Sequence, residues 1–253
     1  MRTLTVTASA PALRARDVTK TYALGETRIE VLRGVGVEVP RGQMCAVMGP
    51  SGVGKSTLLN CIAGLDVPDR GRVEVLGQNI AALDDEGRTL LRRRSIGIVY
   101  QFFNLVPTLT ALENVTLPYL IDGLAPDAAV VAGALERVGM TGRAGHLPGQ
   151  LSGGEMQLVS IARAVVRRPA LILADEPTGN VNVATGRRIM ALLAEVVREA
   201  ACALLLVTHN PEDAARADRV VFMKDGAFCD EAELAGADVT SAAVHDRLKA
   251  LGI

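Results

Sequence analysis

The stretch GPSGVGKST, from Gly49 to Thr57, constrains the fold of this chain more than any other. It matches the pattern G-x-x-x-x-G-K-[ST], follows the apolar run MCAVM and precedes KSTLLNCIAGL, which has helical spacing. Glycines between a strand and a helix let the backbone wrap around phosphates, which the N–H groups and the helix dipole then bind. The expected phosphate-binding residues are Gly49, Pro50, Ser51, Gly52, Val53, Gly54, Lys55, Ser56 and Thr57.

Two side chains of this loop have distinct expected tasks. Lys55 would reach the β and γ phosphates of a nucleotide, and the Ser56 hydroxyl would coordinate Mg²⁺. A phosphate loop alone indicates only nucleotide binding, because kinases, GTPases, helicases and transport ATPases all carry one. Other motifs must therefore decide the function.

Short apolar runs alternate with helical patterns along most of the chain, which predicts an α/β fold with a P-loop NTPase core and a mostly parallel sheet. Residues 13–22 and 28–42 alternate like antiparallel strands and form an expected N-terminal antiparallel β subdomain, with the second run broken by turn residues. Residues from about 107 to 168 are helical in pattern and predict an inserted helical subdomain. Residues 219–231 resemble a hairpin with Asp-Gly at its turn.

The ends of the chain and its composition predict its domain organisation and its location in the cell. We expect a loose tail over residues 1–12, a single ATPase domain over 13–230 and a short helical extension over 231–253 that packs on the core. No uninterrupted apolar segment approaches the roughly 18–20 residues needed to cross a bilayer, and the N-terminus lacks the apolar core of a signal peptide. The formal net charge of −1 gives no reason to expect nucleic-acid binding. These features predict a soluble, cytoplasmic chain.

The stretch LILADEPTGNVN places two adjacent carboxylates, Asp175 and Glu176, at the end of a buried strand. Asp175, at the carboxyl end of a strand parallel to the one before the phosphate loop, is positioned to hold the Mg²⁺ shell. Glu176 would point toward the γ-phosphate and orient or deprotonate an attacking water. The pair thus predicts hydrolysis of the nucleotide.

A third motif, LSGGE, begins a helix with apolar spacing. Ser152 is a natural N-cap, and Glu155 three residues later completes a capping box. Gly153 and Gly154 would expose free N–H groups suitable for a phosphate. From these residues alone, a well-capped helix and a phosphate-binding turn are both open.

The ordered set GPSGVGKST, Gln101, LSGGE, LILADEP and His209 resembles the ATP-binding subunit of an ABC transporter, from about Leu13 to Gly226. The resemblance implies a dimer in which each ATP lies between the phosphate loop of one subunit and the LSGG turn of the other. It also implies that Gln101 touches Mg²⁺ and the attacking water, and that His209 contacts the γ-phosphate. The implied metal ligands are then Ser56, Gln101 and Asp175.

Tyr22 matches the aromatic residue that stacks on adenine in that family, although a strand tyrosine packed on a neighbour is an alternative. Three segments are similar to the macrolide-exporter and lipoprotein-releasing branch, which also includes the cell-division ATPase. They are the residues that follow Gln101, the stretch HLPGQLSGGE and the stretch ADEPTGN. That branch implies a permease partner, which would hold the chain at the inner face of the cell membrane. Phe102 and Phe103 would then border the groove that receives the permease, or else belong to the subdomain core.

Three departures from the family pattern raise a hypothesis about activity. Leu158 stands where an arginine is usual, and Asn182 and Asn210 each stand where an aspartate is usual. Replacing Asp by Asn removes a charge from a hydrogen bond, so we expect a slowed or partner-dependent ATPase. Two functions remain open: a motor that powers transport, and a nucleotide-dependent regulator of the cell-division type. A second identical chain is the expected ATPase partner.

Overall fold

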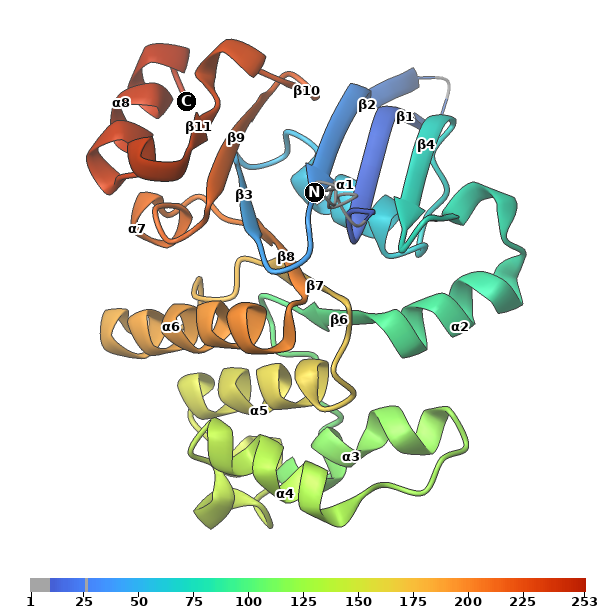
Figure 1. Cartoon of the computed structure of the whole chain (residues 1–253), viewed down its shortest axis with the longest axis vertical. Helices are drawn as coiled ribbons and strands as arrows, with labels where there is room; N and C mark the ends of the chain where they lie inside the picture. The colour runs from blue at the N-terminus through green and yellow to red at the C-terminus, as the bar shows by residue number, and fades with distance from the viewer. Residues whose placement is uncertain (1–9, 26) are drawn as a thin grey trace, which may run out of the picture.

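A mostly parallel sheet forms the centre of the molecule (Figure 1) in the computed structural model, which describes residues 10–25 and 27–253. Its strands follow the order β10-β9-β3-β8-β7-β6, and β11 pairs with β9. The pairs among β9, β3, β8, β7 and β6 are parallel, whereas β10 and β11 pair with β9 in antiparallel fashion. The bounds are β3 Met44–Met48, β6 Ile96–Val99, β7 Leu171–Asp175, β8 Ala203–Val207, β9 Arg219–Lys224, β10 Ala227–Phe228 and β11 Leu234–Ala235.

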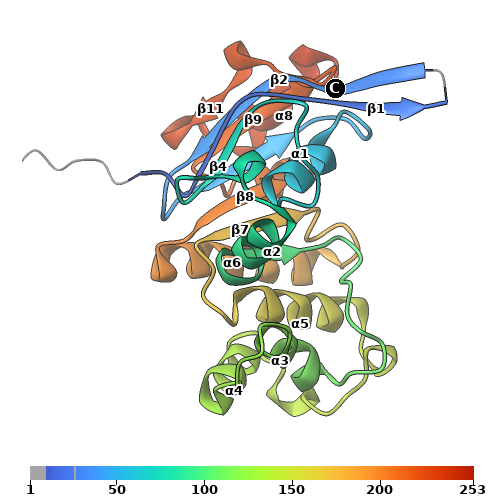
Figure 2. The ribbon, with the colours of Figure 1, turned by 90° about the vertical axis from the view of Figure 1, so that its right-hand side faces the viewer.

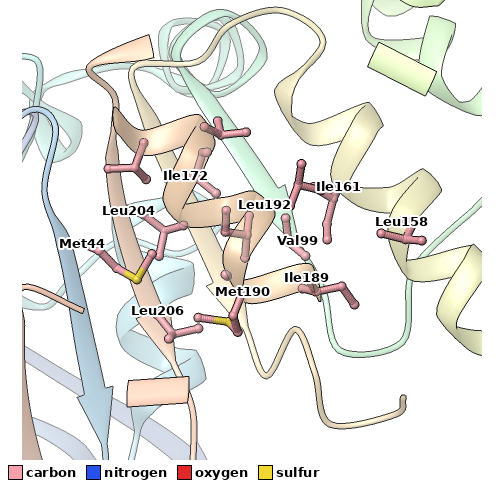
Figure 3. Close-up of a cluster of buried hydrophobic side chains, with 14 of the residues drawn as sticks. Met44, Val99, Leu158, Ile161, Ile172, Ile189, Met190, Leu192, Leu204 and Leu206 are labelled. Atoms are coloured by element: carbon pink, nitrogen blue, oxygen red, sulfur yellow. The ribbon is translucent and has the colours of Figure 1, made fainter. Parts of the chain in front are cut away.

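The central strands are short and apolar because both faces of this sheet are covered. Successive residues of β8 alternate between two core clusters: Leu204 and Leu206 join one, and Leu205 and Val207 join the other. Figure 3 shows the first cluster, in which Leu204 and Ile172 from the sheet meet side chains from two helices. This arrangement confirms the predicted α/β fold.

An antiparallel sheet covers one side of the centre, as predicted. Its strand order is β2-β1-β4-β5, and Figure 2 shows the β1–β2 pair extending well beyond the rest of the molecule. We expected the second run to be broken by turn residues, but β2 is continuous. Gly34, with φ of 73°, lies within it, and shifts in the β1–β2 register accommodate the irregular backbone. The bounds are β1 Leu13–Leu24, β2 Thr27–Val39, β4 Arg70–Val75 and β5 Gln78–Asn79.

Three helices form a layer at the far end from the antiparallel sheet, within the predicted range 107–168 (Figure 1). They are α3 Ala111–Ile121, α4 Ala128–Arg137 and α5 Gly153–Val165. Asn114, fully buried in α3, accepts from the Val106 N–H at 2.8 Å and donates to the Leu109 carbonyl at 3.0 Å. It thereby ties the preceding loop to this layer.

The remaining helices surround the central sheet. The α-helices are α1 Lys55–Ile62, α2 Asp85–Ser95, α6 Val183–Ala200, α7 Pro211–Ala214 and α8 Ser241–Leu251. The short 3-10 turns are η1 Ile80–Ala82, η2 Thr141–Arg143, η3 Pro148–Gln150, η4 Asp230–Ala232 and η5 Gly236–Asp238. None of the helices in the described ranges has both the length and the apolar character needed to span a bilayer.

The expected tail and C-terminal extension fall partly within the described residues. Residues 1–9 of the tail lie outside them, whereas Ala12 is buried and its carbonyl accepts from the Leu76 N–H at 2.9 Å. The C-terminal helix α8 lies against α7, and its Val244 is fully buried in the core. Among the described cysteines all four are free thiols, and only Cys229 is more than marginally exposed.

Candidate functional site

Four parallel strands end at one edge of the central sheet, and the predicted catalytic residues follow them. Gly49 comes directly after β3, Gln101 comes two residues after β6, and His209 two after β8, while Asp175 is the last residue of β7. Because the strands are parallel, their carboxyl ends meet where ligands bind in α/β proteins. The fold therefore brings these four positions to one edge of the sheet.

The loop between β3 and α1 has the backbone that phosphate binding requires. Gly52 and Gly54 have φ of 80° and 112°, which side chains disfavour. A Cβ at Gly54 would lie 2.8 Å from the Val31 carbonyl oxygen, so the loop is also sterically closed to larger residues. No side chain of the described residues caps the start of α1. Its first N–H groups are therefore available to an anion.

Lys55 lies on the concave side of this loop. Its Nζ donates to the carbonyl oxygens of Gly49 at 2.7 Å and Pro50 at 2.8 Å, and the residue is 8% exposed. Burial lowers the pKa of the ammonium, although Glu176 and Asp175 act in the opposite direction. The Lys55 ammonium, held among carbonyl oxygens and near two carboxylates, is therefore suited to bind an anionic ligand.

Asp175 and Ser56 supply oxygen atoms beside that cation. Burial raises the pKa of the Asp175 carboxyl, and the neighbouring Ser56 hydroxyl and Lys55 ammonium oppose this shift. Carboxylate and hydroxyl oxygens are the ligands that Mg²⁺ accepts, together with phosphate oxygens. The donor set thus fits a magnesium nucleotide.

Glu176 leaves the sheet in a strained conformation and contacts His209. Its φ is 46°, in the left-handed region, and its N–H donates to the Val207 carbonyl at 2.9 Å. Its Oε2 lies 2.9 Å from His209 Nδ1 and accepts from the His209 backbone N–H at 3.3 Å. The carboxylate is mostly enclosed and the imidazole mostly exposed.

Gln101 is held by its backbone to the loop after β7. The Asn180 side chain donates to the Gln101 carbonyl at 2.9 Å. Just beyond, Arg163 of α5 donates to the carbonyls of Phe103 at 2.9 Å and Asn104 at 2.7 Å. Gln101 therefore sits on a segment that is tied both to the β7 loop and to the helical layer.

The two phenylalanines after Gln101 differ in exposure, and neither belongs to a core cluster of the described residues. Phe102 is 71% exposed. Phe103 is partly buried, and its Cζ is 3.5 Å from the position that a Cβ on Gly153 would take. Phe103 therefore packs near the LSGG turn, and only Phe102 faces outward.

Tyr22 stands on β1 and is 40% exposed, so it is not packed into the core. Its hydroxyl donates to Asp66 at 2.6 Å, and Lys20 Nζ lies 5.3 Å from its ring centroid. Burial and the bond to Asp66 raise the pKa of the phenol to about 12, while the neighbouring Thr57 hydroxyl lowers it. Tyr22 is thus anchored by its hydroxyl beside the phosphate loop.

The LSGG turn belongs to a second group of residues. Ser152 and Glu155 form the expected capping box: Ser152 Oγ accepts from the Glu155 N–H at 3.3 Å, and Glu155 Oε2 accepts from the Ser152 N–H at 2.9 Å. A cavity of about 330 Å³ adjoins this turn, and no phosphate-loop residue is among its described lining residues. It is lined by Ser152, Gly153, Gly154, Glu155, Leu158, Asn180, Val181, Asn182, Thr185 and Arg188.

The three departures from the family pattern have clear structural places. Asn182 is the N-cap of α6 and accepts from the Thr185 N–H at 2.9 Å, and Asn210 is the N-cap of α7 and accepts from the Glu212 N–H at 2.9 Å. Asparagine and aspartate cap helices about equally well. Leu158 is buried and extends the core cluster of Figure 3 to the cavity.

Several residues that connect the loops of the site to the surrounding helices were not predicted from the sequence. Thr178 donates a short hydrogen bond to Asp213, which is 5% exposed, and thereby links the loop after Glu176 to α7. Gln157, fully buried in α5, donates to two loop carbonyls. For Gln157, the only signal in the sequence is a polar residue on the otherwise apolar side of a predicted helix.

The phosphate loop after β3, the aspartate that ends the parallel strand β7 and the glutamate that follows it define a P-loop protein of the nucleotide-hydrolysing class. The sequence pattern of the ABC transporter family matches residues 32–179, which is more than half of the chain. The chain belongs to the ABC transporter family, as an ATP-binding subunit that hydrolyses ATP.

Relatives match nearly the full length of the chain. It is 50% identical over 221 residues to the lipoprotein-releasing system ATP-binding protein LolD of Ruegeria pomeroyi, covering 86% of this chain and 97% of that protein. It is 45% identical to the macrolide export ATP-binding/permease protein MacB of Chlorobium luteolum, covering 85% of this chain and 32% of that longer protein.

The solved structures agree with these relatives. A dimeric structure of a post-hydrolysis state of the ATP-binding cassette MJ0796, bound to ADP and Pi, is 40% identical, with a TM-score of 0.81. It covers 86% of this chain and 96% of that one. These findings confirm the resemblance inferred from the motifs.

Proposed function

We propose that two copies of this chain enclose two ATP molecules, each between the phosphate loop of one copy and the LSGG turn of the other. The observation that carries this proposal is the division of the motif residues into two groups. Lys55, Asp175, Glu176 and His209 gather at the carboxyl edge of the sheet, whereas Ser152 and its neighbours line a separate cavity. A second copy would bring the two groups together, and the MJ0796 cassette is described as a dimer.

Within each site, the residues divide the chemistry. Ser56, Gln101 and Asp175 would hold Mg²⁺, which neutralises phosphate charge when bound. Glu176 accepts a proton from, or orients, the water that attacks the γ-phosphate. His209 contacts the γ-phosphate from the neighbouring strand end, and Tyr22 stacks on the adenine.

The partner of this motor is a permease of the lipoprotein-releasing or macrolide-exporting type, which holds the chain at the cytoplasmic face of the membrane. The relatives named above support this assignment. A groove of about 400 Å³ between α2, β6, α3 and α5 supports it as well, although neither Phe102 nor Phe103 is among its described lining residues. Its walls combine apolar residues of α3 with five arginines: Arg92, Arg93, Arg94, Arg163 and Arg167.

The charges of this groove indicate what it would bind. Asp122, its adjacent carboxylate, is already held by Arg94 at 3.2 Å and Arg167 at 2.8 Å. The exposed Arg93 is therefore the arginine most available to a partner. An amphipathic permease segment with acidic residues on its polar face would complement both the apolar wall and the arginines.

The test is Mg²⁺-dependent ATP hydrolysis by the purified chain over a range of protein concentrations, with Glu176→Gln as the control. Turnover per chain that rises with concentration and disappears in the variant supports a dimer with Glu176 at its reacting centre. Hydrolysis that persists in Glu176→Gln would overturn the assigned role of Glu176. Turnover independent of concentration, in a chain that stays monomeric with ATP, would overturn the composite site.

A further inference from the structure

Gln157 lies on α5 close to the LSGG turn and is completely buried. Its Nε2 donates to the Pro177 carbonyl at 2.8 Å and to the Tyr100 carbonyl at 3.3 Å. Two carbonyl acceptors fix the orientation of the amide, because only its nitrogen can donate. Its Oε1 is buried and has no hydrogen-bond partner among the described residues.

The two carbonyls belong to residues next to the predicted catalytic groups. Tyr100 directly precedes Gln101, and Pro177 directly follows Glu176. One side chain therefore joins the loop after β6 to the loop after β7. A second bond, from Asn180 to the Gln101 carbonyl, braces the same two loops at 2.9 Å.

The side chain also ties both loops to the helix that starts at the LSGG turn. Ser152 caps α5, and Gln157 lies on the same rigid helix only five positions further along. Motion of the turn would thus move the amide that holds Tyr100 and Pro177. Packing alone does not explain a glutamine here, since a buried amide oxygen without a partner is unfavourable.

We propose that Gln157 is a positioning residue that couples the LSGG turn to the backbone carrying Gln101 and Glu176. The inference rests on the proposed function, in which the LSGG turn contacts the nucleotide of the other copy. ATP bound at that turn then fixes α5, and Gln157 aligns the catalytic loops of its own chain. Closure of one site is thereby communicated to the other through this buried amide.

The test compares Gln157→Met with Ser160→Ala in the full chain. Methionine has nearly the same length and removes both donated bonds. Ser160 is an apt control, because it is equally buried on α5 and its hydroxyl has no partner among the described residues. We expect Gln157→Met to lower kcat for ATP by about tenfold or more, since small misplacements of reacting groups cost that much. KM for ATP should stay unchanged, and Ser160→Ala should change neither value.

A merely structural bond would give a different result. It would lower the unfolding midpoint while leaving kcat per folded chain unchanged, and that outcome, or an equal loss in Ser160→Ala, would overturn the inference. If Gln157→Met does not fold, Gln157→Leu removes the same two donated bonds and should lower kcat without changing KM. Unchanged kcat in Gln157→Leu would then overturn the inference. Failure of the proposed function is recognised separately, by hydrolysis that persists in Glu176→Gln.

Discussion

The carboxylate of Glu176 and the imidazole of His209 face each other across the ends of two adjacent parallel strands. Nδ1 lies 2.9 Å from Oε2, and the same oxygen accepts from the His209 backbone N–H at 3.3 Å. The β7–β8 pairing fixes this relationship, because Asp175 is paired with Val207 in the sheet. Each group therefore limits the orientation of the other.

His209→Ala is expected to lower kcat for ATP by about a hundredfold, because Glu176 loses the partner that orients it and the γ-phosphate loses a contact. ATP binding should persist, since Lys55 and the phosphate loop are unaffected. Single-turnover hydrolysis and binding of a fluorescent ATP analogue measure the two quantities. The backbone N–H remains in the variant, so undiminished hydrolysis would show that the ring has no part in the reaction.

Tyr22 offers a matched pair of substitutions. Tyr22→Ala should raise KM for ATP by about tenfold if the ring stacks on adenine, whereas Tyr22→Phe should leave KM unchanged. The phenylalanine variant loses the 2.6 Å bond to Asp66, which Lys20 still holds at 2.5 Å. An equal rise of KM in both variants would assign the effect to the anchoring hydroxyl instead of the ring.

Asn182 caps α6, and its replacement separates capping from charge. Asn182→Ala should lower the free energy of unfolding by about 1 kcal/mol. Asn182→Asp should match or exceed the wild type, because an anion at a helix N-terminus is favourable by roughly 0.3–1 kcal/mol. Urea unfolding measures both. We also expect the aspartate variant to hydrolyse ATP faster, and unchanged turnover with and without the permease would contradict that hypothesis.

Asp213 should make stability depend on pH. Burial raises the pKa of its carboxyl above the ordinary 3.8, although Thr178 opposes the shift. Such a group stabilises the fold fully below its ordinary pKa, and this contribution is lost as pH rises through the raised value. Asp213→Asn keeps an oxygen acceptor for Thr178 but does not titrate. The free energy of unfolding that Asp213→Asn gains over the wild type should therefore be larger at about pH 8 than at a pH close to the ordinary 3.8. Urea midpoints that shift equally at both pH values would contradict this.

Arg93→Glu tests the groove. Reversing this exposed charge should reduce the permease-bound fraction about tenfold or more, because like charges would then face each other across the interface. Arg41→Glu is the matched control, since Arg41 is also exposed and is not among the described residues lining the groove. Co-purification with a tagged permease at two salt concentrations provides the measurement. An equal loss in both variants would point to net charge and not to the groove.

The sequence predicted the parts of the site that follow from strand ends. Gly49, Asp175 and His209 each end or follow a short apolar run, and parallel strands bring such positions to one edge. The continuous β2 was missed because turn residues suggest a break, whereas pairing with β1 accommodates Gly34 through shifts in register. Local signals cannot reveal what a neighbouring strand tolerates.

Side-chain connections were the least predictable. In the last turn of α2, Arg92 donates to the Gly64 carbonyl at 3.1 Å and Arg94 to Asp122, and both line the groove together with Arg93. Gln157 donates to carbonyls 20 and 57 positions away in sequence, and Asp213 accepts from Thr178, 35 positions away. Contacts at such separations depend on the assembled fold and leave no periodic trace.

At Glu176, the left-handed backbone favours one residue for stability, and the proposed hydrolysis requires another. With φ of 46°, this residue holds a conformation that glycine would adopt without cost. Folding alone would favour the loss of its side chain, whereas the proposed role of Glu176 in hydrolysis requires it to stay. Selection for thermal stability without selection for ATP turnover would therefore favour the replacement of Glu176. The resulting proteins would be stable and would bind ATP without hydrolysing it.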